Sequence, residues 1–112
     1  MLKRLHRFHG HNTVATLYRR GTTLRGQNLS IKYATRPGDK PFRAAVVVSR
    51  KVSKSAVVRN RIRRRVYETI NQHQTALANR ELVITVFSDQ FATMPIDKLE
   101  AILAPLLEQI GK

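Results

Sequence analysis

The chain has 112 residues, with 21 Lys and Arg against 7 Asp and Glu, a formal net charge of +14 and a sequence pI ≈ 11.5. This length allows one domain with a single modest core, and 42% hydrophobic content excludes a wholly disordered basic tail. The chain has no cysteine, which excludes disulfides and thiolate metal sites, and so strong a positive charge indicates a nucleic-acid partner.

Apolar runs are too short for membrane insertion. The longest, residues 82–87, contains Thr85 and falls well below the roughly 20 residues of a membrane span. The basic residues 1–7 precede no apolar stretch of secretory length. We therefore expect a cytoplasmic protein without membrane contact, in agreement with the absence of cysteine.

The first eleven residues are basic and polar and are interrupted by Gly10. We expect residues 1–11 to form a flexible basic arm. It contains His6, His9 and His11, but this spacing gives no i, i+4 helical pair and no carboxylate lies near to orient a ring. The histidines are interpreted as additional hydrogen-bond donors, and no metal site is expected.

A short helix is predicted next, ending at Arg20. Asn12 or Thr13 can cap its start, and Gly21 suits the position just after its end. Its apolar side carries Val14, Leu17 and Tyr18. General burial preferences leave open whether Tyr18 is a core residue or faces a ligand.

Alternating residues then predict strands. Residues 22–33 alternate in polarity with an interruption at Gly26, which indicates one bent strand or two short ones. Residues 36–41, RPGDKP, are expected to form an exposed hairpin loop. Residues 44–48 are mostly apolar and predict a strand buried on both faces.

The most informative stretch is a basic helix predicted at residues 56–76. Its apolar residues fall on one stripe at about 100° per residue, as a helix docked on a core requires: Val58, Ile62, Val66 and Ile70. The helix and the segment before it carry eight cations: Arg50, Lys51, Lys54, Arg59, Arg61, Arg63, Arg64 and Arg65. No acid occurs between Asp39 and Glu68.

These cations repel one another because arginine stays protonated at ordinary pH. Guanidinium groups suit phosphate oxygens, and the helix start near residues 53–55 adds backbone N–H donors. The pattern favours a nucleic-acid backbone as the partner. A merely solvated charged face fits less well, because solvated helices usually interleave Glu with Lys or Arg.

The last third predicts a strand and a helix. Residues 82–87 form a second apolar strand, and the strand-helix-strand spacing suggests parallel pairing, with the basic helix as the crossover. Pro95 suits the first turn of a final helix, whose apolar stripe is Leu99, Ile102, Leu103, Leu106 and Ile110. Pro105 predicts a kink near residues 101–104 or an early stop. The expected order is α-β-β-(β)-α-β-α in one domain, residues 1–112.

One segment resembles a known family. Residues 56–64, AVVRNRIRR, preceded by Arg50, Lys51 and Val52, resemble the RNR signature of the bacterial ribonuclease P protein component. Weaker matches at residues 5–7, 18–21 and 82–87 extend the resemblance over nearly the whole chain. It implies an α/β (α+β) sandwich similar to domain 2 of ribosomal protein S5, with a left-handed crossover at the RNR helix.

The resemblance also implies a function. As the protein subunit of ribonuclease P, an endoribonuclease, the chain would bind the catalytic RNA and the 5′ leader of precursor tRNA and aid removal of that leader. The chemistry is expected in the RNA subunit together with Mg²⁺, because seven scattered acids offer no converging carboxylate site. No catalytic residue, protein-held cofactor or obligate protein partner is expected in this chain.

Motif positions assign the site residues. The catalytic RNA is expected to contact Arg50, Lys51, Lys54, Arg59, Asn60, Arg61, Arg63, Arg64 and Arg65. A cleft between the first helix and the sheet would hold the leader, and its expected lining is Val14, Tyr18 and either Lys32 or Tyr33, which the spacing from Gly21 leaves open. Two departures from the family are Val14, where a Phe is usual, and the loop sequence VSKS, where a Gly is frequent.

Two other classes of protein remain as alternatives. A basic ribosomal protein could bind structured rRNA through the same arginines, and composition does not distinguish it. A sequence-specific DNA binder is less favoured, because its recognition helix usually mixes several polar residues among the basic ones. Among the arginines of residues 59–65 only Asn60 is of that kind.

Overall fold

The computed structural model describes residues 6, 11–36 and 41–112. In chain order the elements are α1 (His11–Arg20), β1 (Thr22–Gly26), β2 (Leu29–Thr35), β3 (Arg43–Val48), α2 (Ala56–Gln72), β4 (Arg80–Val86), the 3-10 helix η2 (Asp89–Ala92) and α3 (Ile96–Gly111). The predicted α/β class and element order are confirmed, with two short strands where one bent strand was the alternative. His11 begins α1 instead of ending the basic arm, and the arm otherwise lies outside the described residues apart from His6.

The four strands form one sheet in the order β1-β2-β4-β3. β3 and β4 pair in parallel, so the prediction that the basic helix connects two parallel strands is confirmed. The predicted hairpin at residues 36–41 is wrong, because β4 lies between β2 and β3. The tight hairpin instead joins β1 to β2, where Asn28 takes a positive φ of 59°, a conformation that Asn tolerates better than most residues.

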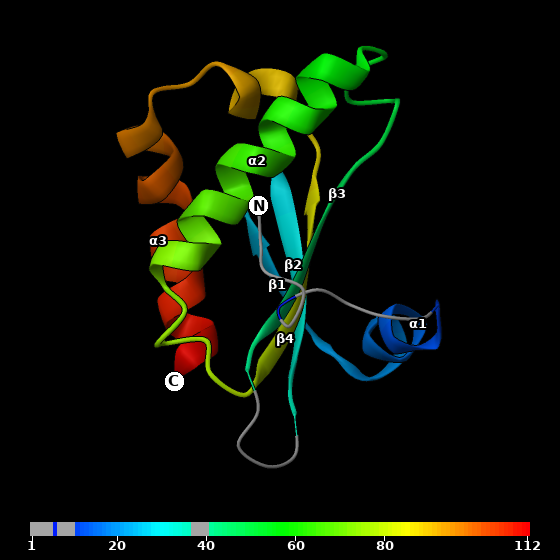
Figure 1. Ribbon diagram of the computed structural model, residues 1–112, viewed down its shortest axis with the longest axis vertical. Coiled ribbons are helices and arrows are strands. Elements are labelled where there is room, and N and C mark those ends of the chain that lie inside the picture. The colour runs from blue at the N-terminus through cyan, green and yellow to red at the C-terminus, as the bar shows by residue number, and fades with distance from the viewer. Residues whose placement is uncertain (1–5, 7–10, 37–40) are drawn as a thin grey trace.

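The sheet separates two layers of helix. Figure 1 shows α2 and α3 on one face of the sheet and α1 on the other. The main core lies on the α2–α3 side and takes alternate strand residues: Leu29, Ile31, Ala44, Val46, Val48, Leu82, Ile84 and Val86. β3 is therefore buried on one face and not on both, and Val47 on its other face is 40% exposed.

Two predicted helix ends differ from those observed. α2 ends at Gln72 and not at residue 76, and the His73 N–H bonds to the Ile70 carbonyl in a tightened last turn. The following turns allow Leu77 to become fully buried. Of the two outcomes predicted at Pro105, a kink or an early stop, the early stop is wrong: α3 continues through Pro105 to Gly111, because buried residues on both sides hold the helix to the core. These residues are Leu99, Leu103, Leu107 and Ile110.

Candidate nucleic-acid interface

The basic helix begins at a defined cap. Ser55 has an extended backbone, and its hydroxyl accepts a hydrogen bond of 3.3 Å from the Val58 N–H. The first turn of α2 contains no acid to neutralise the positive end of the helix dipole. Burial of Ile62 and Val66 against the sheet fixes the rotation of the helix about its own axis. The remaining faces of the first turns therefore direct the arginines outward.

The predicted outward arrangement of the RNR residues is observed. Asn60, Arg61 and Arg64 are exposed, while Arg59 and Arg63 are partly buried. Arg63 Nη1 donates to Asn60 Oδ1 at 2.9 Å. This contact orients the Arg63 side chain. Because a guanidinium has five N–H donors, the others remain available for an anion.

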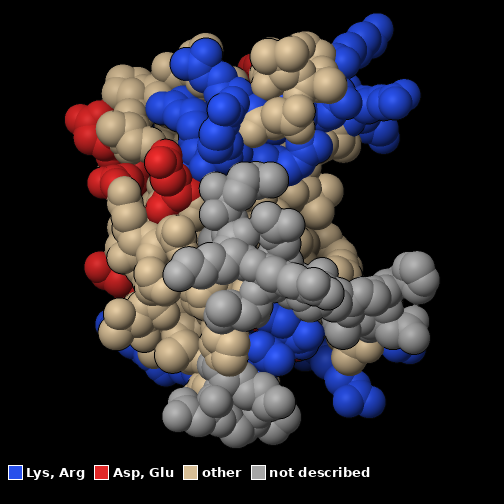
Figure 2. Space-filling model, viewed as in Figure 1, with Lys and Arg blue, Asp and Glu red and all other residues tan. Residues whose placement is uncertain are grey.

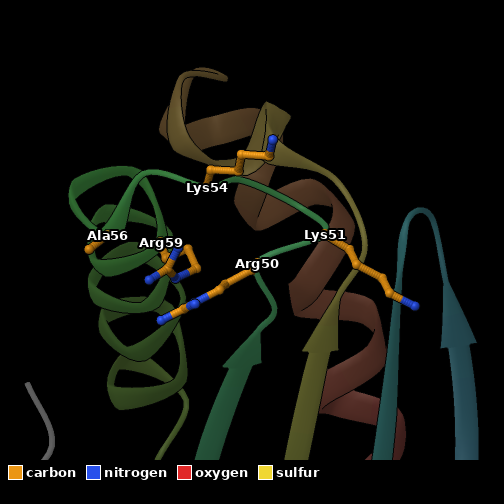
Figure 3. Close-up of a pocket in the computed structure, with 5 residues that line it drawn as sticks. All are labelled: Arg50, Lys51, Lys54, Ala56 and Arg59. Atoms are coloured by element: carbon orange, nitrogen blue, oxygen red, sulfur yellow. The ribbon is translucent and has the colours of Figure 1, made fainter.

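Cations from the β3–α2 loop and the start of α2 line a common pocket. This open pocket of about 660 Å³ is lined by Arg50, Lys51, Lys54, Ala56 and Arg59. In Figure 3 the Arg50 and Arg59 side chains reach toward one another, while Lys51 extends away from α2. Several positive charges thus face one solvent-filled space beside the helix start, an arrangement that favours phosphate.

The backbone carbonyl of Ser53 orients the side chain of Arg59, which lines this pocket. Arg59 Nη1 donates to the Ser53 carbonyl at 2.9 Å, and the Ser53 hydroxyl accepts from the Ser55 N–H at 3.2 Å. The loop residues Ser53 to Ser55 are therefore ordered by contacts with α2, although the glycine frequent in the family is missing. Sequence reasoning did not predict these contacts of Ser53, because both its carbonyl and its hydroxyl find their partners only through the fold of the loop.

Arg65 differs from the other predicted RNA contacts. Its guanidinium donates to the carbonyl oxygens of Phe91 and Met94, which lie in and just after η2. It is partly buried against the connection between β4 and α3. The structure thus places Arg65 apart from Arg61 and Arg64, with protein acceptors for its charge.

Charge is unevenly distributed over the molecule. Figure 2 shows Lys and Arg gathered at the end where α2 begins, with further Lys and Arg toward the opposite end, and Asp and Glu mainly on the α3 side. Among the described residues, the ion pair is Arg43–Glu81 at 2.7 Å, at the opposite end of β3 from Arg50. Near it, burial and then the charge of Arg43 lower the pKa of Arg36, and Glu81 partly offsets this. The basic end beside α2 is separate from this paired cluster.

The other face of the sheet carries the second predicted site. Leu17 of α1 is buried, with 1% of its surface exposed, and α1 packs against β2 and β4. Its neighbour Tyr18 is 44% exposed, so Tyr18 is not a core residue. Val14 is partly buried in the same helix. The phenol ring of Tyr18 is therefore accessible to a ligand.

Strand register separates Lys32 from Tyr33. Lys32 pairs with Val83, whereas Tyr33 pairs with Leu82 and packs against the α2–α3 core. Since successive strand residues point to opposite faces, Lys32 lies on the α1 side. Its ammonium group donates to Thr23 Oγ1 at 2.6 Å across the β1–β2 pair. Lys32, and not Tyr33, thus shares a face with α1.

The predicted histidine cluster is only partly described. His6 is buried, its Nδ1 lies 2.9 Å from the Phe42 carbonyl, and its ring stacks on that of Phe42 with centroids 3.9 Å apart. His9 and the side chain of His11 lie outside the described residues. In the described part of the chain, no group of three or more His, Asp or Glu side chains is placed to hold a metal ion. No described helix has both the length and the apolarity to cross a membrane.

Comparison with known proteins gives one family. The family model for ribonuclease P matches residues 2–111. A curated relative, the ribonuclease P protein component of Picosynechococcus sp., is 40% identical over 65 residues, which cover 58% of this chain and only 55% of the relative. The chain thus matches about half the length of that relative.

Solved structures of the same family show the same fold. The Staphylococcus aureus RNase P protein has a TM-score of 0.78 and 19% identity, with coverage of 93% of this chain and 94% of that one. The Thermotoga maritima RNase P protein has a TM-score of 0.77 and 21% identity, with coverage of 87% and 90%. At these identities the likeness establishes the fold alone.

Proposed function

The chain belongs to the ribonuclease P protein family, and on this basis we propose that it is the protein subunit of ribonuclease P. In this role it binds the catalytic RNA and the 5′ leader of precursor tRNA, and it aids removal of the leader. The observation that carries the proposal is the pocket of four cations at the capped start of α2. Its charges and helix-terminal donors match the phosphates of a folded RNA.

The RNA-binding surface consists of the pocket and the exposed RNR residues beside it. Arg61 and Arg64 are exposed and extend the positive surface along α2. The first turn of α2 contains no carboxylate that would neutralise this charge. Arg50, Lys51 and Lys54 bring charge from the preceding loop to the same end of the molecule. Each phosphate neutralised there releases a counterion, so binding depends strongly on salt.

The leader occupies the α1 side of the sheet. Tyr18 offers an exposed aromatic ring, and Lys32 places a cation on the same side. Stacking of a base on the ring and attraction of the backbone to the ammonium group bind an extended single strand. The two sites lie on different surfaces, so the protein can contact both RNAs at once.

Cleavage chemistry belongs to the RNA subunit in this proposal, and Mg²⁺ is bound there. Metal-dependent hydrolysis requires converging carboxylates. In this chain Glu81 is held by Arg43, and Glu68 lies on the exposed surface of α2. The protein contributes by neutralising phosphates and by binding the leader. The proposed place of this activity is the cytoplasm.

Copurification tests this assignment against a ribosomal protein or a DNA binder. The full chain, expressed in a bacterial cell and isolated at low salt, is expected to retain one structured RNA of the ribonuclease P type. Recovery of whole ribosomal subunits would favour the ribosomal alternative, and recovery of genomic fragments would favour DNA binding. Sequencing the retained nucleic acid distinguishes the three.

A further inference from the structure

An aromatic side chain is exposed where β4 ends. Phe87 directly follows β4 and exposes 58% of its surface. We propose that Phe87 is a stacking platform for an unpaired nucleobase of the precursor tRNA leader, at the end of the sheet beyond α1. This inference rests on the proposed function and adds a residue that neither the sequence motifs nor the basic pocket assigns.

The main chain fixes the side of the sheet on which Phe87 lies. Its N–H donates to the Asn28 carbonyl at 2.9 Å, which continues the β2–β4 ladder one pair beyond Leu29–Val86. Val86 points into the core. Because side chains alternate along a strand, Phe87 lies on the opposite face, together with Thr85 and Val83. That is the side on which Lys32 lies.

The neighbouring positions on this face carry short side chains that are partly or largely exposed. Thr85 pairs with Ser30 on one side and with Val47 on the other. Val47 is 40% exposed, and Thr85 and Ser30 are partly buried. Hydroxyl groups, a small apolar side chain and an exposed ring therefore form one continuous surface. A flat base can lie on such a surface without the displacement of a larger side chain.

The surrounding charges favour RNA over a protein partner. Arg25 is exposed and pairs with Ser30 on the same face, while Lys51 is exposed shortly after β3 ends beside β4. The described acids of β4 and α3 lie elsewhere: Glu81 is paired with Arg43 at the far end of the strand. Asp89, two residues after Phe87 in the first turn of η2, is the nearest acid in the sequence. Aromatic rings flanked by cations are the usual means of binding single-stranded nucleic acid, and Arg25, Lys32 and Lys51 supply such cations on this side.

The position of Phe87 suits the leader in particular. Lys32 pairs with Val83, and Val83 lies four residues before Phe87, so the ring stands about 13 Å along the sheet from Lys32 at about 3.3 Å per residue. An extended strand that passes Tyr18 and Lys32 can reach Phe87 with a few more nucleotides. The same strand then approaches Lys51, at the edge of the basic pocket.

The test uses full-length protein reconstituted with ribonuclease P RNA. Phe87→Leu keeps an apolar side chain and removes the aromatic face, whereas Phe87→Trp keeps it. Ile96→Ala is the matched control, because Ile96 is 48% exposed at the start of α3. Dissociation constants are measured for precursor tRNA and for leaderless mature tRNA. A fluorescent 2-aminopurine base is placed at successive leader positions, and thermal unfolding verifies the fold of each variant.

We expect Phe87→Leu to weaken precursor binding by about 5- to 150-fold, the range for one stacked base, with mature tRNA unaffected. Phe87→Trp retains binding, and 2-aminopurine is quenched at one leader position in the wild type but not in Phe87→Leu. Wild-type precursor binding by Phe87→Leu overturns the inference, as does equal weakening for both tRNAs or equal weakening by Ile96→Ala. Failure of the wild-type protein to stimulate the RNA at all would instead overturn the proposed function.

Discussion

Arg65 and Phe91 are joined across two elements that are distant in the sequence. Arg65 Nη1 on α2 donates to the Phe91 carbonyl in η2 at 2.8 Å, and its other terminal nitrogen donates to the Met94 carbonyl. The Phe91 side chain is buried in the core. A residue of the basic stretch thus ties α2 to the connection between β4 and α3, and its charge serves the fold.

Arg65→Ala is expected to destabilise the protein. It removes a charged donor from two partly buried carbonyl acceptors, which costs about 2 kcal/mol in the free energy of unfolding. Urea unfolding measures this cost. Arg64→Ala, one residue earlier and exposed, is the control and should change stability by less than about 0.5 kcal/mol. Equal stability of both variants would show that the Arg65 hydrogen bonds contribute nothing to the fold.

Arg61 and Arg64 are expected to contact phosphates. Replacing both with Ala should reduce the slope of log affinity for ribonuclease P RNA against log salt by about one unit for each phosphate that is no longer neutralised. Affinity measurements over a salt series give the slope, and circular dichroism verifies folding. Lys replacements retain the charge and should weaken binding only where the arginine binds its phosphate in a bidentate manner. A salt slope equal to that of the wild type would remove these residues from the interface.

The sequence predicted the basic helix better than it predicted the sheet. The stripe of Val58, Ile62, Val66 and Ile70 is a local pattern of period 3.6. The last three residues are fully buried, and Val58 is partly buried against the same core. The insertion of β4 between β2 and β3 depends on long-range pairing, which no local pattern specifies. For this reason the segment at residues 36–41 was wrongly predicted to close a hairpin.

Site residues were predictable by type but not by partner. Arg65 is an arginine like its two preceding neighbours, so the sequence does not distinguish it from them. Only the position of η2 in the fold reveals its two carbonyl acceptors. The choice between Lys32 and Tyr33 required the register with Val83 and Leu82. Phe87 reads as the last apolar residue of a buried strand, and only the uncovered end of the sheet makes it accessible.

Tyr18→Ala tests the leader site. Because Tyr18 is 44% exposed, its replacement should leave stability within about 0.5 kcal/mol of the wild type. Precursor tRNA binding by the holoenzyme should weaken by about 1–3 kcal/mol, as for one stacked base, with mature tRNA unaffected. Leu17→Ala is the contrasting variant: Leu17 is buried, so the free energy of unfolding should fall by about 2–5 kcal/mol. Equal weakening of binding for both tRNAs would argue against stacking by Tyr18.

Substitutions at Lys32 and at Tyr33 should have different effects in the same binding assay. Lys32→Ala removes a cation from the α1 side and should weaken precursor binding with a reduced salt dependence. Tyr33→Leu alters a residue packed on the opposite core, so its effect should be on stability. Fluorescence binding and urea unfolding measure the two quantities for each variant. A leader-specific defect confined to Tyr33→Leu would contradict the assignment from strand register.

The division of labour between protein and RNA gives the last prediction. Protein alone should not cleave precursor tRNA, because its carboxylates are dispersed: Glu81 is paired with Arg43, Glu68 is exposed on α2, and Asp97 lies in the first turn of α3. The RNA alone should cleave at high Mg²⁺, because metal ions can then screen the phosphates that the protein otherwise neutralises. The two together should cleave at low Mg²⁺, with tighter substrate binding as the main gain. Gel assays of the 5′ end under the three conditions measure this. Mg²⁺-dependent processing by RNA-depleted protein would assign the chemistry to the polypeptide, whereas the absence of any stimulation would remove its role as a subunit of this enzyme.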